Sequence, residues 1–249
     1  MRQEIKIIHK PDDKEPFIIL YKPRYMPSAP LNENDNENAL SLCASLYPQI
    51  KNVKGKKEIE YGLIHRIDTV TDGLLLIACT QDFYDSLIEQ QKEGQFIKKY
   101  RAVCSFIPDL AKLKEGFSYC HNAEDVKKMK DGQTLSFVKE SMFRMYGPGR
   151  KEVRPVLENG SKAEIKKAGT KFYSTQIEVT KNSNEYKAVC TIKEGYRHQV
   201  RAHLAWSCLP VKGDRLYNPY CKEGDEFLFT AFYLSFKNPV DGSECVFEI

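Results

Sequence analysis

Residues 61–79 read YGLIHRIDTVTDGLLLIAC, and this stretch decides how the whole chain is interpreted. Its second half, residues 73–78, has the length and apolar composition of a buried strand. Its first half places four ionisable side chains within eight positions: His65, Arg66, Asp68 and Asp72. A carboxylate that leaves water costs several kcal/mol unless it is paired and hydrogen-bonded. The stretch is therefore either a turn whose charges face water or a segment that holds Asp68 near a core for chemistry.

The composition is that of an ordinary soluble globular protein. Of the 249 residues, 41% are apolar and 29% are charged, which is enough for a substantial core. The formal net charge of +4 permits a polyanionic partner without requiring one. The N-terminus lacks the apolar stretch of a signal peptide, and no run approaches the ~20 apolar residues of a membrane helix. We therefore expect a cytoplasmic, monomeric protein that does not enter a membrane.

The eight cysteines form no CxxC pair. Several lie in apolar or alternating runs, which favours small buried side chains in a reducing cytosol. A disulfide framework or a zinc site is the alternative. The spacing of His65, His198 and His203 matches no familiar metal site, so we expect no metal.

Strands and helices are predicted on both sides of the central stretch. Residues 16–21 are apolar and predict a buried strand, and residues 39–46 predict a short helix that a proline ends. Thr80 is placed to cap a helix over residues 81–92. Residues 96–107 alternate with period two, which predicts a long strand with one apolar face.

The second half of the chain predicts a series of antiparallel strands. Residues 109–160 are the least legible part, because they hold many charges and five glycines. The strands predicted here and beyond are 134–138, 141–145, 161–169, 172–180, 185–193 and one or two within 226–239. A helix is predicted within residues 195–208, with Arg197 and Arg201 on nearby faces. The pattern as a whole indicates a strand-rich α+β protein.

Residues 65–76, HRIDTVTDGLLL, closely resemble the HRLDxxTSGLLL signature of RNA pseudouridine synthases of the RluA type. Ile67 replaces leucine, and Asp72 replaces the usual serine and adds negative charge near the turn. Other elements follow in the family's order, and the likeness spans about residues 17–239. They are the KP element at 19–23, the KxYxA strand at 99–102, GYRHQVRAHL at 195–204, a loop like VGDxLY at 211–217, and the last strand at 231–239.

The resemblance implies three catalytic residues. Asp68 is implied as the nucleophile or general carboxylate, Tyr100 as the residue against the target base, and Arg201 as the partner that orients Asp68. A nearby arginine favours the ionised carboxylate, which can attack a sugar carbon. Base–aromatic stacking is worth ~1–3 kcal/mol. From the residues alone, a backbone-bonded aspartate, a core tyrosine and a solvated helical arginine are the alternatives.

Four further residues are expected to contact RNA. Arg66 fills the gap left by an extruded base or binds a phosphate, and His65, Arg197 and Lys22 complete the group. Arg197 departs from the family, which has threonine there and arginine one position earlier. Clusters of Lys and Arg, such as residues 51–57, supply phosphate contacts where they border the site. His198 is expected to orient its turn or helix by hydrogen bonds.

The reaction that the resemblance implies is the isomerisation of uridine to pseudouridine in structured ribosomal or transfer RNA. The bond from C1′ to N1 breaks, the uracil turns, and C5 joins C1′. Asp68 either stabilises or captures C1′, or the C2′ proton leaves first; the sequence does not decide between these routes. Nothing is oxidised, so no cofactor is expected, and the chain has no Gly-rich dinucleotide fingerprint or P-loop.

The fold implied by the resemblance is α+β, with a bent, mixed, largely antiparallel sheet and a central cleft. We expect residues 1–249 to form a single catalytic domain without a separate N-terminal RNA-binding domain, because the KP element begins near residue 22. Two other functions remain open. A carboxylate-dependent glycosidase or nucleosidase needs a second acid opposite Asp68, and an RNA-binding assembly factor has the same fold without activity.

Overall fold

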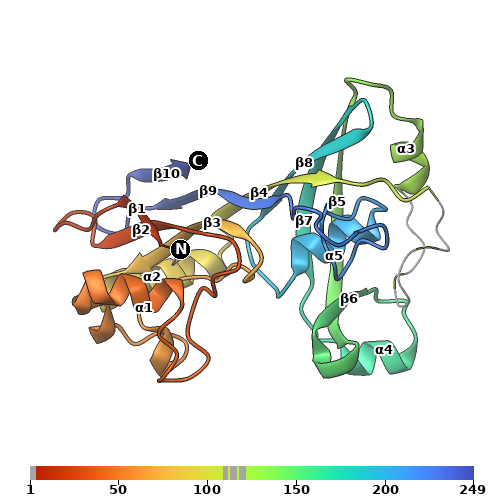
Figure 1. Ribbon diagram of the computed structural model, residues 1–249. Helices are drawn as coiled ribbons and strands as arrows, with labels where there is room; N and C mark the ends of the chain where they lie inside the picture. The colour runs from red at the N-terminus through yellow and green to blue at the C-terminus, as the bar shows by residue number, and fades with distance from the viewer. Residues whose placement is uncertain (1–3, 109–111, 113–116, 118–121) are drawn as a thin grey trace. The chain divides into compact units, whose positions relative to one another are not determined.

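The computed structural model describes residues 4–108, 112, 117 and 122–249. The chain divides into two compact units, which are residues 1–98 with 230–249 (unit 1) and residues 99–229 (unit 2). The described part of the chain holds ten strands and five α-helices, and most strand pairs are antiparallel (Figure 1). The expected α+β class with a mixed, largely antiparallel sheet is therefore confirmed. The bend, the central cleft and the single catalytic domain stay predictions.

Unit 1 is built on the predicted central strand. β2 (Phe17–Lys22) and β3 (Asp72–Ala78) are antiparallel, and every residue of β3 is buried, as its uninterrupted apolar run predicts. β1 (Lys6–His9) extends the sheet beyond β2. β9 (Phe229–Lys237) is parallel to β3 at its start, and β10 (Glu244–Glu248) is antiparallel to β9. β1 was not predicted, because its four residues are exposed or partly exposed and form no apolar pattern.

The two predicted helices of unit 1 are confirmed. They are α1 (Ala39–Leu46) and α2 (Gln81–Lys92). Thr80 accepts a hydrogen bond from the Phe83 N–H at 3.4 Å and so caps α2 as expected. The single turns η1 (Pro48–Asn52) and η2 (Glu58–Glu60) follow α1. Phe83 and Leu87 of α2 pack on apolar residues of β2 and β3, and this layer fixes the strand that follows Asp68.

Unit 2 contains a four-stranded antiparallel sheet in the order β8-β7-β5-β6. β4 (Ile97–Cys104) leads the chain into this unit. The bounds of the four strands are β5 (Thr134–Tyr146), β6 (Glu152–Val156), β7 (Tyr173–Asn182) and β8 (Glu185–Ile192). β5 is one strand where the sequence predicted two, because its first part pairs with β7 and its second part with β6.

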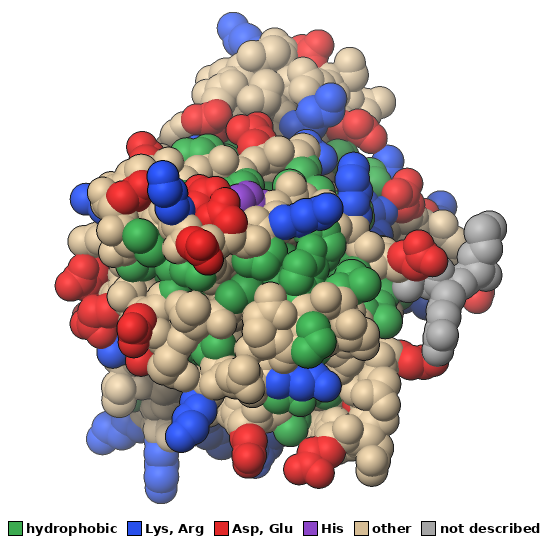
Figure 2. Space-filling view, turned by 90° about the vertical axis from the view of Figure 1, so that its left-hand side faces the viewer, with side chains coloured by type: hydrophobic (Ala, Val, Ile, Leu, Met, Phe, Trp, Pro, Cys, Tyr) green, Lys and Arg blue, Asp and Glu red, His purple; other side chains and the backbone are tan. Residues whose placement is uncertain are grey.

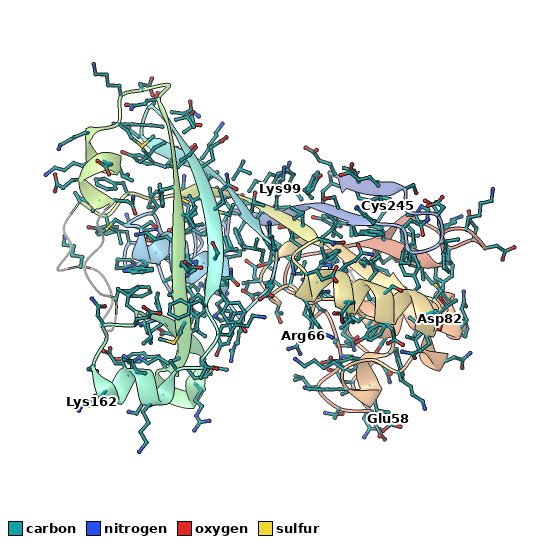
Figure 3. The ribbon with its side chains drawn as sticks, turned by 180° about the vertical axis from the view of Figure 1, so that it is seen from behind. Glu58, Arg66, Asp82, Lys99, Lys162 and Cys245 are labelled. Carbon is teal, nitrogen blue, oxygen red and sulfur yellow. The ribbon has the colours of Figure 1, made fainter. Side chains whose placement is uncertain are left out.

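The helices of unit 2 correct two predictions. The predicted strand at 161–169 is wrong, because α4 (Lys162–Lys167) begins there with a capping box between Ser161 and Glu164. α5 (Gln199–Trp206) is the predicted helix, but it begins after His198, so Arg197 does not share a helix with Arg201. The remaining helix is α3 (Ala123–Lys128). Lys162 in Figure 3 marks the start of α4.

The described cysteines are free thiols, and five of the seven are buried. This agrees with the interpretation of the cysteines as small apolar side chains, while Cys120 lies outside the described residues. Burial raises the pKa of the Cys79 thiol to about 11.

None of the described helices is long and apolar enough to cross a membrane. Figure 2 shows acidic and basic side chains interspersed with apolar ones on the face that it presents.

Candidate active site

Asp68 lies in the loop that leads into β3, and hydrogen bonds hold the backbone on both sides of it. The Ser28 hydroxyl donates to the Ile67 carbonyl at 2.7 Å and accepts from the Ile67 N–H at 3.2 Å. The Thr71 N–H donates to the Asp68 carbonyl at 3.0 Å. Asp68 itself is partly exposed. The loop therefore fixes the backbone of this carboxylate and leaves the residue accessible.

Lys22 is a fully buried cation against the same loop. Its ammonium donates to the carbonyls of Met26, Pro23 and Thr69 at 2.7, 2.9 and 3.3 Å. Burial lowers the pKa of Lys22 to about 8, and the negative charges of Asp72 and Asp68 partly offset this effect. The sequence predicted that Lys22 contacts RNA, whereas these bonds direct its ammonium to the protein's own backbone.

Asp72 is a buried carboxylate with several donors around it. The Tyr21 hydroxyl donates to it at 2.8 Å, Arg24 Nε at 2.9 Å and the Thr230 hydroxyl at 3.2 Å. The negative charge that we expect near the turn is therefore buried inside unit 1. There the Asp72 carboxylate at the start of β3 accepts hydrogen bonds from side chains of β2 and β9. A cation and two hydroxyls offset the cost of burying it.

The glycine after Asp72 permits this arrangement. Gly73 has φ +133°, and a Cβ atom built on it lies 2.1 Å from the Ala231 carbonyl oxygen. A side chain at this position therefore prevents the close approach of β3 to β9 that brings Thr230 to the Asp72 carboxylate.

The two residues at the start of the signature have different environments. Arg66 in Figure 3 has a side chain that is 61% exposed, and its Nη1 donates to the buried Glu60 carboxylate at 3.2 Å. The His65 ring nitrogens are buried, and neither has a hydrogen-bond partner in the described part of the chain. Burial lowers the pKa of His65 well below its usual 6.5, and the charge of Lys98 acts in the same direction. Arg66 is therefore placed to reach a ligand, while His65 is neutral.

In unit 2, Arg201 is buried and binds Asp214 through two parallel hydrogen bonds. Nε donates to Oδ2 and Nη2 to Oδ1, both at 2.8 Å. Asp214 also accepts from the N–H groups of Leu216 and Tyr217 at 2.9 and 3.3 Å. The sequence named the element at 211–217 but missed Asp214 as the partner of Arg201. The predicted pairing of Arg201 with Asp68 joins residues of two units and stays a prediction.

Aromatic rings surround this ion pair. The Arg201 guanidinium carbon lies 5.3 Å from the ring centres of both Tyr217 and Phe227, within the range of cation–π attraction. The Tyr217 hydroxyl accepts from the Val153 N–H at 2.9 Å and lies 3.1 Å from His198 Nδ1. Burial raises the pKa of Tyr217. His198 therefore takes part in a hydrogen bond that orients the start of α5, as expected.

A buried polar network joins α5 to the sheet of unit 2. His203 Nδ1 lies 2.8 Å from the Thr175 hydroxyl, and Nε2 lies 3.0 Å from the Ser141 hydroxyl. The Gln199 amide donates to the Ser174 carbonyl at 2.9 Å. Burial lowers the pKa of His203 to about 3, so the ring is neutral at physiological pH. Because these bonds reach both β5 and β7, they fix the rotation of the helix that carries Arg201.

Tyr100 lies on the buried side of β4 and is 8% exposed. Its ring stacks on Phe229, with ring centres 5.2 Å apart and planes inclined by 8°. The sequence missed Phe229 as its neighbour. The role of Tyr100 against a target base stays a prediction.

The match of a sequence profile shows the family of the chain. A sequence profile described as RNA pseudouridylate synthase matches residues 16–206, and the chain belongs to this family. The prediction of an RluA-type relative is thereby confirmed.

The relatives give the same family. A ribosomal large subunit pseudouridine synthase D of Neisseria meningitidis is 26% identical over 75% of this chain and 44% of its own length. An uncharacterized RNA pseudouridine synthase YlyB of Bacillus subtilis is 25% identical over 75% of this chain and 51% of its own length. The chain thus spans about half the length of the curated relatives it matches.

A solved structure has the same fold. Human RNA pseudouridylate synthase domain containing 1 superposes with a TM-score of 0.65 at 17% identity, covering 100% of this chain and 84% of that chain. The likeness at this identity concerns the fold.

Proposed function

We propose that the chain is an RNA pseudouridine synthase that isomerises uridine to pseudouridine, with Asp68 as the catalytic carboxylate. The observation that carries the proposal is the family match over residues 16–206, which includes Asp68, Tyr100 and Arg201. The fixed backbone around Asp68 also supports it, because a reacting group must be held in one geometry.

The chemistry assigns Asp68 to the ribose. As the C1′–N1 bond breaks, C1′ gains positive character, and the carboxylate stabilises this charge or captures C1′. The uracil then turns and forms a bond from C5 to C1′, and the hydrogen at C5 leaves as a proton. Tyr100 stacks on the base, and Arg201 orients Asp68.

The remaining predicted residues divide into contact and positioning roles. Arg66, which is largely exposed, contacts the RNA backbone or the gap left by the extruded base. Lys22 and His65 act from inside unit 1, because the Lys22 ammonium binds the loop carbonyls and the His65 ring nitrogens are buried.

We further propose that the substrate is ribosomal RNA, with transfer RNA as the alternative, and that the protein acts as a cytoplasmic monomer. The names of several relatives, ribosomal large subunit pseudouridine synthases, support the first choice. Mapping of pseudouridines in cells with and without this protein identifies the modified RNA. A missing pseudouridine in transfer RNA alone contradicts the ribosomal assignment.

The activity is tested with RNA transcripts that carry tritium at C5 of uridine, since this isomerisation releases that hydrogen to water. We expect the wild-type protein to release tritium and Asp68→Asn to release none while it still binds RNA. Asp13→Asn, which removes an exposed aspartate of the same unit, is the matched control and retains release. Normal turnover by Asp68→Asn excludes Asp68 as the catalytic carboxylate.

The same assay separates the two other functions. A glycosidase or nucleosidase yields free uracil in place of pseudouridine, which chromatography of the digested RNA detects. An assembly factor without activity binds RNA and yields neither product. Either outcome with the wild-type protein overturns the proposed function.

A further inference from the structure

Unit 2 carries an exposed basic turn at residues 147–151, sequence GPGRK. Its backbone is unusual, because Gly147, Gly149 and Arg150 have φ values of +76°, +64° and +53°. A positive φ is uncommon for an arginine and persists where other contacts hold it. The turn is therefore a fixed loop that presents two cationic side chains, Arg150 and Lys151.

Arg197 provides the contacts that hold this turn. Its Nη1 donates to the Arg150 carbonyl at 3.1 Å and its Nη2 to the Lys151 carbonyl at 3.2 Å. Arg197 is itself exposed, so its guanidinium stays at the surface beside the turn. In the described part of the chain, none of these three side chains forms an ion pair with a carboxylate. Three cations thus lie together, and none has an ion-pair partner among the described residues.

Aromatic rings continue this surface. Tyr196, next to Arg197, stacks on Phe143 with ring centres 5.0 Å apart and planes inclined by 9°. Tyr173 lies 5.2 Å from Tyr196, and both tyrosines are partly exposed. The Lys171 ammonium lies 5.9 Å from the Tyr173 ring but is paired with the Glu194 carboxylate at 2.6 Å, so it adds no net charge to this surface. Because Phe143 supports one face of Tyr196, the ring is rigid enough to receive a stacked base.

We propose that the turn 147–151, Arg197, Tyr173 and Tyr196 form a surface that binds a single-stranded segment of the RNA substrate. Phosphates bind the three cations, and an unpaired base stacks on the tyrosine pair. RNA as the partner rests on the proposed function. An acidic protein segment also pairs with the three cations, but it has no bases to stack on the tyrosine rings. The combination of cations and stacked rings therefore favours RNA.

The resemblance makes this surface specific to the chain. Tyr196 and Arg197 stand where the family sequence has arginine and threonine. Compared with the family sequence, the arginine stands one position later, at 197, from where its guanidinium binds the carbonyls of the turn. A tyrosine ring, stacked on Phe143, occupies position 196 in place of the family's arginine. Arg197 is therefore a positioning residue for Arg150 and Lys151 as well as a phosphate contact.

The charge part is tested by fluorescence anisotropy with a labelled single-stranded RNA of about 12 nucleotides, a length within the usual range of such sites. Affinity is measured across a series of KCl concentrations for the wild type and for Arg150→Ala/Lys151→Ala. Each phosphate contact on a single strand changes the slope of log K against log[salt] by about 0.7. We expect the double variant to have a slope smaller by about 1.4 and to bind about 25-fold more weakly at 0.1 M salt.

The matched control removes two exposed lysines of unit 1, Lys6→Ala/Lys10→Ala, with the same loss of charge. We expect its salt slope to equal that of the wild type. Equal slopes for the two double variants, or no binding of the oligonucleotide by the wild type, overturn the proposal.

The stacking part is tested with Tyr196→Leu, and Tyr196→Phe is its control. We expect the leucine variant to bind about 5- to 150-fold more weakly with an unchanged salt slope, and the phenylalanine variant to bind like the wild type. Equal losses for a fully paired duplex of the same sequence overturn the assignment to single strands. Tritium release by the wild type is measured separately, so failure of the proposed function and failure of this surface give different results.

Discussion

Replacement of Asp214 by asparagine tests whether the Arg201–Asp214 pair holds unit 2 together. The side chains of the pair are only 4% and 1% exposed, and both hydrogen bonds between them are 2.8 Å long. Asparagine keeps the shape and one acceptor oxygen, but it removes the negative charge that faces the buried guanidinium through both hydrogen bonds. Breaking a buried pair in this way costs about 3–5 kcal/mol, against a typical total stability of about 5–15 kcal/mol.

The assay is urea unfolding followed by the fluorescence of Trp206. This residue is the only tryptophan of the chain, and it lies on α5, the helix that carries Arg201. We expect the free energy of unfolding of Asp214→Asn to be about 3–5 kcal/mol below that of the wild type. The matched control is Glu185→Gln, which removes one charge from the half-exposed pair with Lys212 and should cost below about 1 kcal/mol.

A second variant separates the buried charge from the lost hydrogen bonds. Addition of Arg201→Met to Asp214→Asn removes the guanidinium that has lost its Asp214 carboxylate, while the amide oxygen still accepts from the backbone N–H groups of Leu216 and Tyr217. We expect this double variant to regain about half of the lost stability, because neither residue of the pair remains charged. If Asp214→Asn costs no more than Glu185→Gln, or if the double variant is no more stable than Asp214→Asn, the reasoning is refuted.

Two other perturbations have defined outcomes. Asp72→Ser restores the residue of the family sequence but removes the carboxylate that accepts from Arg24, Tyr21 and Thr230, so urea unfolding should give a loss of about 2 kcal/mol; an unchanged stability means that these hydrogen bonds contribute nothing. The pKa of His203 is about 3 in the native state and 6.5 in the unfolded chain, so the unfolded state gains a proton first as the pH falls. The wild type should therefore lose about 3 kcal/mol more than His203→Gln between pH 7 and pH 4, and parallel losses contradict the assignment.

The parts of the fold that the sequence predicts are those with a strong local signal. The run 73–78 is uninterrupted and apolar, and β3 is buried at every residue. The helix at 81–92 has a capping threonine and an apolar face, and its bounds agree with those of α2. The segment KAEIKK has no apolar face, so its alternation favours a strand, whereas the capping box of Ser161 and Glu164 begins a helix there.

The candidate site residues could be named from the sequence only where the family motif contains them. Asp68, Tyr100 and Arg201 come from the resemblance, whereas the partners of the buried charges come from distant positions. The donors to Asp72 lie 51, 48 and 158 residues away, and Asp214 lies 13 residues from Arg201. No periodicity or spacing encodes such pairs, because they depend on which strands become neighbours.

The charges around the apolar strand of unit 1 belong to two kinds, and the difference bears on why they are present. Asp72 and Lys22 are buried and surrounded by hydrogen-bond partners, while Asp68 is partly exposed on a loop that these residues help to hold. Buried ionic groups contribute little net stability compared with well-packed apolar residues of similar volume. A strand selected only for stability has no need of them. We therefore propose that these buried charges serve to hold the loop of Asp68, to which Lys22 is bonded at the Thr69 carbonyl, more than to stabilise the sheet.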